Sequence, residues 1–227
     1  MQKQSVLFAI GGLVVGLIVG FMGANSLNRN SGSATPVSPE SATIAQGDQP
    51  NQNVAAGQPL ADVSEMIRRA EAEPQNFAVQ MRTGDMYAQI GRFEKAIEFY
   101  SKGVALRPDD FKANVVLANA YFDSGSFEKA GDYYEKALAA DPKDVNARSD
   151  LGATFVERPS PDYDRAISEF NTALGTEPAH APSLYYLAVA QLRKGNATEA
   201  QKTLSKLEQA NPNSDLVNRL RQQLSTK

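Results

Sequence analysis

From residue 59 to the C-terminus, apolar side chains recur three and four positions apart along the chain. This spacing lines one face of an α-helix and differs from the strict alternation of a half-buried strand. In the first clear example, a stretch from about residue 76 to 89 is followed by Gly91 and by a second stretch from about 93 to 106, which Pro108 closes. Proline cannot donate the next helical hydrogen bond. The pattern therefore predicts two antiparallel helices joined by a short turn.

The same pair of stretches occurs four times. The prolines that separate the copies are 34, 34, 36 and 34 residues apart: Pro74, Pro108, Pro142, Pro178 and Pro212. Small residues recur where two helices can cross closely, at Gly84, Ala118, Gly152 and Ala188 and again at Ala96, Ala130, Ala166 and Ala200. Glycine, which adopts positive φ readily, recurs at the predicted turn as Gly91, Gly125 and Gly195. A fixed period near 34 residues is typical of a helical repeat array.

With these residues the chain resembles the tetratricopeptide repeat (TPR) family. The resemblance implies an all-α fold, a right-handed α-solenoid of antiparallel helix pairs, with four units at residues 77–110, 111–144, 145–180 and 181–214. Apolar stripes at 59–73 and 213–225 predict a capping helix at each end of a TPR domain that covers 59–227. Two features depart from the family. The third turn, at 158–162, is two residues longer and lacks the glycine, and Gln80, Asn114, Arg148 and Leu184 replace a large aromatic residue.

The resemblance also implies a concave face, lined by the first helix of each unit, that binds an extended peptide or a helix of a partner protein. The family's groove positions fall on Met81, Asp85, Lys112, Val115, Asn119, Phe122, Ser149, Tyr185 and Val189. We expect Met81, Asp85, Asn119 and Tyr185 to be exposed there, and Asn119 to be able to hydrogen-bond a peptide main chain. For Phe122, core packing is an equally good interpretation.

Residues 6–24 contain no charged side chain, and as a helix they would be roughly 28 Å long, close to the thickness of a bilayer core. After a short tail at 1–5, they predict an uncleaved transmembrane signal anchor. A cleaved signal peptide is the alternative, although its apolar core is usually shorter. Lys3 precedes the segment and Arg29 follows it, so the positive-inside bias is weak. It favours a cytoplasmic N-terminus, with the rest of the chain in the periplasm of a bacterium.

Gly12, Gly16, Gly20 and Ala24 place small side chains on one face of this segment. Such a face allows close packing of membrane helices, either in a homodimer or against a partner's helix. The alternative interpretation is the ordinary glycine content of membrane helices.

Residues 25–58 are rich in Asn, Ser, Gly, Thr, Pro, Ala and Gln and show no periodicity. They cannot bury enough apolar area to offset chain entropy, so they predict a disordered linker. A flexible chain of this length spans roughly 30 Å.

Composition narrows the function. The net charge is −3 and no basic cluster occurs, so nucleic acid is not an expected partner. The chain has no cysteine and one histidine, His180, at an inter-repeat turn. This excludes a cluster of His and Cys ligands, and we expect no metal, no cofactor and no enzyme. The sequence predicts a membrane-tethered adaptor or assembly factor that binds a protein or peptide. The alternatives are an organelle-surface receptor with a cytosolic TPR domain and a self-assembling scaffold.

Overall fold

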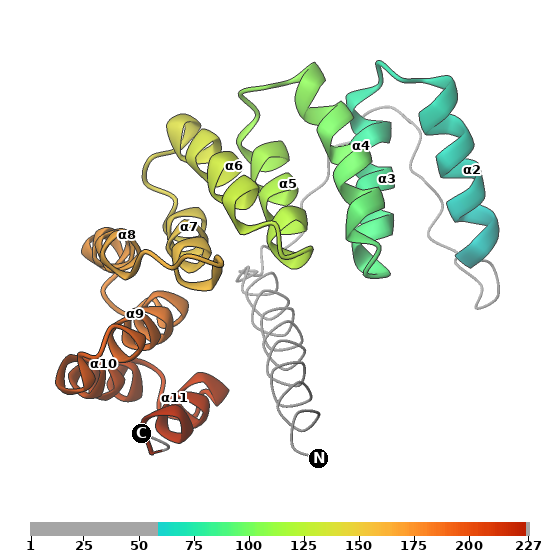
Figure 1. Ribbon diagram of the computed structural model, residues 1–227. Coiled ribbons are helices and arrows are strands. Elements are labelled where there is room, and N and C mark those ends of the chain that lie inside the picture. Colours follow the sequence, from blue (N-terminus) through green and yellow to red (C-terminus); the bar gives the residue numbers. More distant parts are fainter. Residues whose placement is uncertain (1–58, 226–227) are drawn as a thin grey trace, which may run out of the picture. The chain divides into compact units, whose positions relative to one another are not determined.

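The computed structural model describes residues 59–225, which form ten helices and no strand (Figure 1). The helices are α2 (Pro59–Ala72), α3 (Phe77–Gln89), α4 (Phe93–Leu106), α5 (Phe111–Asp123), α6 (Phe127–Ala140), α7 (Val145–Glu157), α8 (Tyr163–Thr176), α9 (Ala181–Arg193), α10 (Ala197–Ala210) and α11 (Asp215–Ser225). Each helix packs against the next one along the chain. The prediction of an all-α array of helix pairs is confirmed. The predicted membrane anchor and linker lie outside the described residues, and none of the described helices is long and apolar enough to cross a membrane.

Within a unit, the two helices cross where the sequence has a small residue. At Gly84 in α3, an added Cβ atom would lie 2.4 Å from Cδ1 of Tyr100 in α4. At Gly152 in α7, it would lie 2.6 Å from Cε1 of Phe170 in α8. At these two crossings only glycine fits under the ring without displacing it.

The turns inside the units are closed by one recurring hydrogen bond. Gly91, Gly125 and Gly195 have φ angles of 70°, 78° and 95°, as predicted, and the amide of the next residue bonds a carbonyl in the first helix, as in Arg92 N to Tyr87 O at 2.9 Å. The third turn lacks the glycine, yet Asp162 N donates to Phe155 O at the same distance. The two extra residues are therefore absorbed in the loop, and the helix pair closes as in the other units.

The polar residues that replace the family's aromatic side chain bond the last turn of the preceding helix or the turn that follows it. Gln80 Nε2 donates to the carbonyl of Ala70 at 2.8 Å, Asn114 Nδ2 to that of Pro108 at 2.7 Å, and Arg148 Nη2 to that of Pro142 at 2.7 Å. These carbonyls lie at or just after the end of a helix, where no helical donor is available. The fourth unit has Leu184 at this position, buried in the core.

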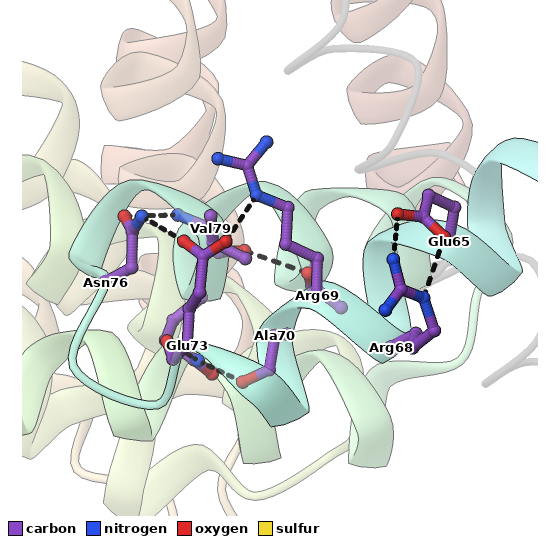
Figure 2. A network of polar contacts seen from close by, with 9 residues as sticks. Glu65, Arg68, Arg69, Ala70, Glu73, Asn76 and Val79 are labelled. Atoms are coloured by element: carbon purple, nitrogen blue, oxygen red, sulfur yellow. Dashed lines mark hydrogen bonds and ion pairs between the residues drawn. The ribbon is translucent and has the colours of Figure 1, made fainter.

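The terminal helices present polar residues to solvent. On α2, Arg68 pairs with Glu65 at 2.6 Å and Arg69 pairs with Glu73 at 2.9 Å (Figure 2), while Ala70 is buried. On α11, Val217 and Leu220 are buried, whereas Asn218, Arg221 and Gln222 are exposed. Each end of the array thus carries a helix with one apolar face and one polar face, as a soluble solenoid requires.

Candidate functional site

We call the side of the first helices (α3, α5, α7 and α9) that carries the nine predicted groove residues the A face. The exposure of these residues falls along the chain. Asp85 and Lys112 are exposed, and Met81, Val115, Asn119 and Phe122 are half-buried. Ser149, Tyr185 and Val189 are buried, with 1%, 5% and 2% of their surface exposed. The accessible part of the A face therefore lies on α3 and α5.

The prediction that Tyr185 is exposed is wrong, because α9 is covered on both sides. α9 packs against α7 and against the C-terminal helix α11, and Gln223 of α11 donates a hydrogen bond of 3.2 Å to the Tyr185 hydroxyl. Val189 belongs to the same buried apolar cluster as Tyr185. Ser149 is buried in α7. These three side chains do not offer a partner an accessible surface in this structure.

Helices α3 and α5 lack such direct packing and share at most marginal contact. Their A-face residues remain accessible for this reason. Phe122 is a partial exception, because its ring packs edge to face on Phe127 at a centroid distance of 5.1 Å. Val115 also packs against a buried cluster, so both side chains contribute to the core as well as to the surface.

Two polar residues of the A face are held by tyrosines from the second helix of their own unit. Tyr100 in α4 donates a hydrogen bond of 2.7 Å to Oδ1 of Asp85, and Tyr134 in α6 donates one of 2.6 Å to Oδ1 of Asn119. Neither tyrosine is singled out in the Sequence analysis above. The sequence nevertheless distinguishes the units at this position, because only the first two have a tyrosine hydroxyl, whereas the third and fourth have Phe170 and Leu204.

Two carboxylates of the first helices have raised pKa values. Burial raises the pKa of Asp123, at the end of α5, to about 6. Burial, together with repulsion from Asp144 and Asp123, raises the pKa of Asp150 in α7 to about 7. No group of three or more acidic, histidine or cysteine side chains that could hold a metal ion occurs in residues 59–225.

Two sequence models of one known protein family match this chain. A family model for the tetratricopeptide repeat matches residues 161–224, and a TPR repeat model matches residues 84–123 and 118–157. Together they span more than half of the chain. The chain belongs to the tetratricopeptide repeat family.

Solved structures share the TPR fold. A crystal structure of MamA superimposes with a TM-score of 0.61 and 23% identity, and the match covers 66% of this chain and 86% of MamA. MamA from Desulfovibrio magneticus RS-1, residues 41 to the end, gives a TM-score of 0.63 with 20% identity over 70% of this chain and 89% of that one. These likenesses show the fold alone. A comparison with curated protein sequences gave no match.

His180 has a structural role in the TPR array. It precedes α9, and its Nδ1 atom accepts a hydrogen bond of 3.3 Å from the backbone amide of Ser183. The Ser183 hydroxyl lies 2.8 Å from the same nitrogen, and Nε2 lies 3.1 Å from Oδ1 of Asn146. Burial lowers the pKa of His180, so the neutral ring with its proton on Nε2 fits these contacts. Asn76, Asp110 and Asp144 cap the other first helices in the same way.

The remaining predicted residues, Gly12, Gly16, Gly20 and Ala24, lie outside the described part of the chain. Close packing of a membrane helix through this face, in a homodimer or with a partner, stays a prediction.

Proposed function

We propose that this TPR protein is an adaptor or assembly factor, tethered to a membrane by residues 6–24, that binds a segment of a partner protein on the A face of α3 and α5. The observation that supports this most is the accessibility of this part of the A face together with its fixed polar groups. Asp85 is exposed and Asn119 is half-buried, and each has one oxygen that accepts a hydrogen bond from a buried tyrosine. A binding surface with orientation already fixed has less entropy to lose on association.

The binding face can be tested by photo-crosslinking in the native cells. A photoreactive amino acid replaces Lys112, which is exposed on the A face of α5, and in a second strain it replaces Lys206, which is exposed on the second helix α10. We expect a defined protein adduct from position 112 and none from position 206. Equal adducts from both positions, or none from position 112, would contradict a partner site on the A face.

The proposed location is the bacterial inner membrane, with the TPR domain in the periplasm. Because the chain has no cysteine, Ser38→Cys creates a unique thiol between the anchor and the domain. A membrane-impermeant thiol reagent should label it in intact cells whose outer membrane admits the reagent. Labelling only after lysis would place the domain in the cytosol and favour the receptor alternative.

The scaffold alternative depends on the small-residue face of the anchor. Replacing Gly16 by isoleucine would separate two membrane helices that pack there. If crosslinked oligomers of the full chain vanish in this variant, then self-assembly through the anchor is favoured. If they persist unchanged, the anchor does not drive assembly.

A further inference from the structure

Two half-buried carboxylates face each other where the second and third TPR units join. Asp123 is the last residue of α5, and Asp150 is the sixth residue of α7. The charge of Asp123 repels that of Asp150, so the two groups are neighbours across the junction. Within residues 59–225, neither side chain accepts a hydrogen bond or forms an ion pair. The contact therefore carries negative charge that the described domain does not neutralise.

The repeat accounts for this contact. It brings the last residue of one first helix near the sixth residue of the next, as it also does for Glu157 and Tyr186. Glu157, however, pairs with Arg193 at 3.2 Å. At the junction of the first and second units, the equivalent residues are Gln89 and Val116, which do not ionise. Among the described units, the second junction thus differs by placing two unpaired acids at this contact.

The uncharged and acidic groups around Asp150 do not relieve the repulsion. Tyr134 of α6 and Tyr186 of α9 lie near it, and burial raises the pKa of both hydroxyls, so they stay neutral. Asp144, before α7, adds a further negative charge. His180 lies near Asp144, but burial lowers the pKa of this histidine and favours its neutral ring.

The cations nearby are already engaged. Arg148 of α7 bonds Glu169 of α8 at 2.9 Å, and Arg193 of α9 bonds Glu157. Neither arginine lowers the pKa of Asp123 or Asp150. The charge of the two aspartates therefore depends on protons alone.

The two carboxyl groups lose their protons in sequence as the pH rises. Burial raises the pKa of Asp123 to about 6, and burial with repulsion raises that of Asp150 to about 7. Asp123 therefore ionises first, and its charge opposes the ionisation of Asp150. Helices α5 and α7 share at most marginal direct contact and are joined mainly through α6, so little apolar packing between them resists this repulsion.

We propose that Asp123 and Asp150 make the junction between the second and third units a pH-sensitive hinge. At acid pH, the protons held by the pair allow α5 and α7 to lie close together. When both carboxylates are ionised, their repulsion separates the two helices and loosens the junction. This device goes beyond the proposed function, because it operates without a partner.

Hydrogen exchange of the full chain in detergent micelles tests the hinge at pH 6 and pH 8, with each rate divided by the intrinsic rate at that pH. We expect the protection of α5 and α7 to fall roughly tenfold between pH 6 and pH 8, and that of α10 to change much less. Asp150→Asn should remove most of this difference, whereas the matched control Asp132→Asn, exposed on α6, should keep it. An equal fall in every helix, or an unchanged fall in Asp150→Asn, would overturn the hinge.

A double-mutant cycle separates repulsion between the two carboxylates from the burial of each one alone. At pH 8, Asp150→Asn should raise the protection of α7 less in an Asp123→Asn background than in the parent. Equal gains in both backgrounds would mean that the two carboxylates do not interact, and the hinge would be rejected.

The movement itself is measured by pulsed electron paramagnetic resonance, because the chain has no cysteine to interfere with spin labelling. Labels at Asp109→Cys and Lys143→Cys, exposed before α5 and α7, span the hinge, and labels at Gln75→Cys and Asp109→Cys span the first junction as the matched control. We expect the first distance to lengthen from pH 6 to pH 8 and the second to stay constant. No change, or an equal change in both, would overturn the proposal. This measurement leaves both carboxylates in place, so it decides the question even if an asparagine variant does not fold.

Discussion

At the scale of single residues, the tightest constraint lies where the two helices of a unit cross. Gly84 lies under the ring of Tyr100, which is almost fully buried and cannot move outward freely. Gly175 in α8 offers the contrast, because nothing lies within 4 Å of an added Cβ atom there. A side chain at position 84 would collide with the Tyr100 ring, whereas one at position 175 would meet no neighbour. Substitution by alanine should therefore have opposite effects on stability at the two positions.

We expect Gly84→Ala to destabilise the domain by about 1–3 kcal/mol, because the added methyl group overpacks the crossing. Gly175→Ala should instead stabilise it by about 0.5–1 kcal/mol, since alanine restricts the unfolded chain and favours the helix. Urea unfolding followed by circular dichroism measures both. A similar response at both positions would mean that the Tyr100 ring yields to the methyl group.

The raised pKa of Asp150 predicts that the free energy of unfolding falls as the pH rises. Its pKa is about 7 in the folded protein against an ordinary value of 3.8, so the folded state holds the proton more tightly. The contribution of Asp150 to stability is therefore present at acid pH and is lost as the pH rises through about 7. Asp150→Asn should raise the free energy of unfolding by roughly 1–3 kcal/mol at pH 8 and change it little near pH 4. The control Asp109→Asn, at an exposed turn position, should change the free energy of unfolding by the same amount at both pH values.

At the scale of elements, the first helices are capped by side chains and most second helices are not. The residues before α3, α5, α7 and α9 accept a hydrogen bond from a backbone amide in the first turn of the helix, as does Asp162 before α8. The residues before α4, α6 and α10 make no such bond. The longer inter-unit turns leave the capping residue extended, which brings its side chain to the helix end.

We expect Asp110→Ala to cost about 0.5–2 kcal/mol, because it removes the 2.9 Å bond to the amide of Ala113. Asn196→Ala, at the corresponding position before α10, removes no capping bond and should stay within about 0.5 kcal/mol of the parent. Thermal unfolding of the two variants compares them directly. A loss at Asn196 as large as that at Asp110 would contradict this account of the caps.

At the scale of the whole repeat domain, apolar packing is uneven. The largest buried cluster joins α7 through α11 and includes Phe170, Leu184, Leu207 and Leu220. The cluster that holds α2 contains only Ala70, Val79 and Phe99 as buried members. Because a solenoid is stabilised by its own units and their nearest neighbours, local opening should follow this difference.

We expect the backbone amides of α9 to exchange with deuterium at least about tenfold more slowly than those of α3, while α2 exchanges fastest. Hydrogen exchange followed by mass spectrometry measures this along the chain. Truncation after residue 212 removes α11 and should accelerate exchange in α9 but leave α3 unchanged. Uniform exchange across the helices would show that the array opens as one cooperative unit.

Much of the architecture depends on residues that are close in the sequence, and it could be predicted without the structure. The first predicted pair, at about 76–89 and 93–106, coincides with α3 and α4 to within one residue. The turn glycines adopt the positive φ that their positions implied. These features depend on neighbours in the chain, and the 34-residue period repeats them.

Exposure of the A face was decided only by the tertiary structure. Periodicity assigns Met81 and Tyr185 to equivalent positions, yet Met81 is half-buried and Tyr185 is buried, since α9 packs against both α7 and α11. The bonds from Tyr100 to Asp85 and from Tyr134 to Asn119 join residues 15 positions apart across two helices, which a single-helix pattern does not show. The sequence by itself determined the repeat and its helices because these are local. The fold decided which of the four equivalent surfaces a partner can reach, because that depends on how distant helices pack.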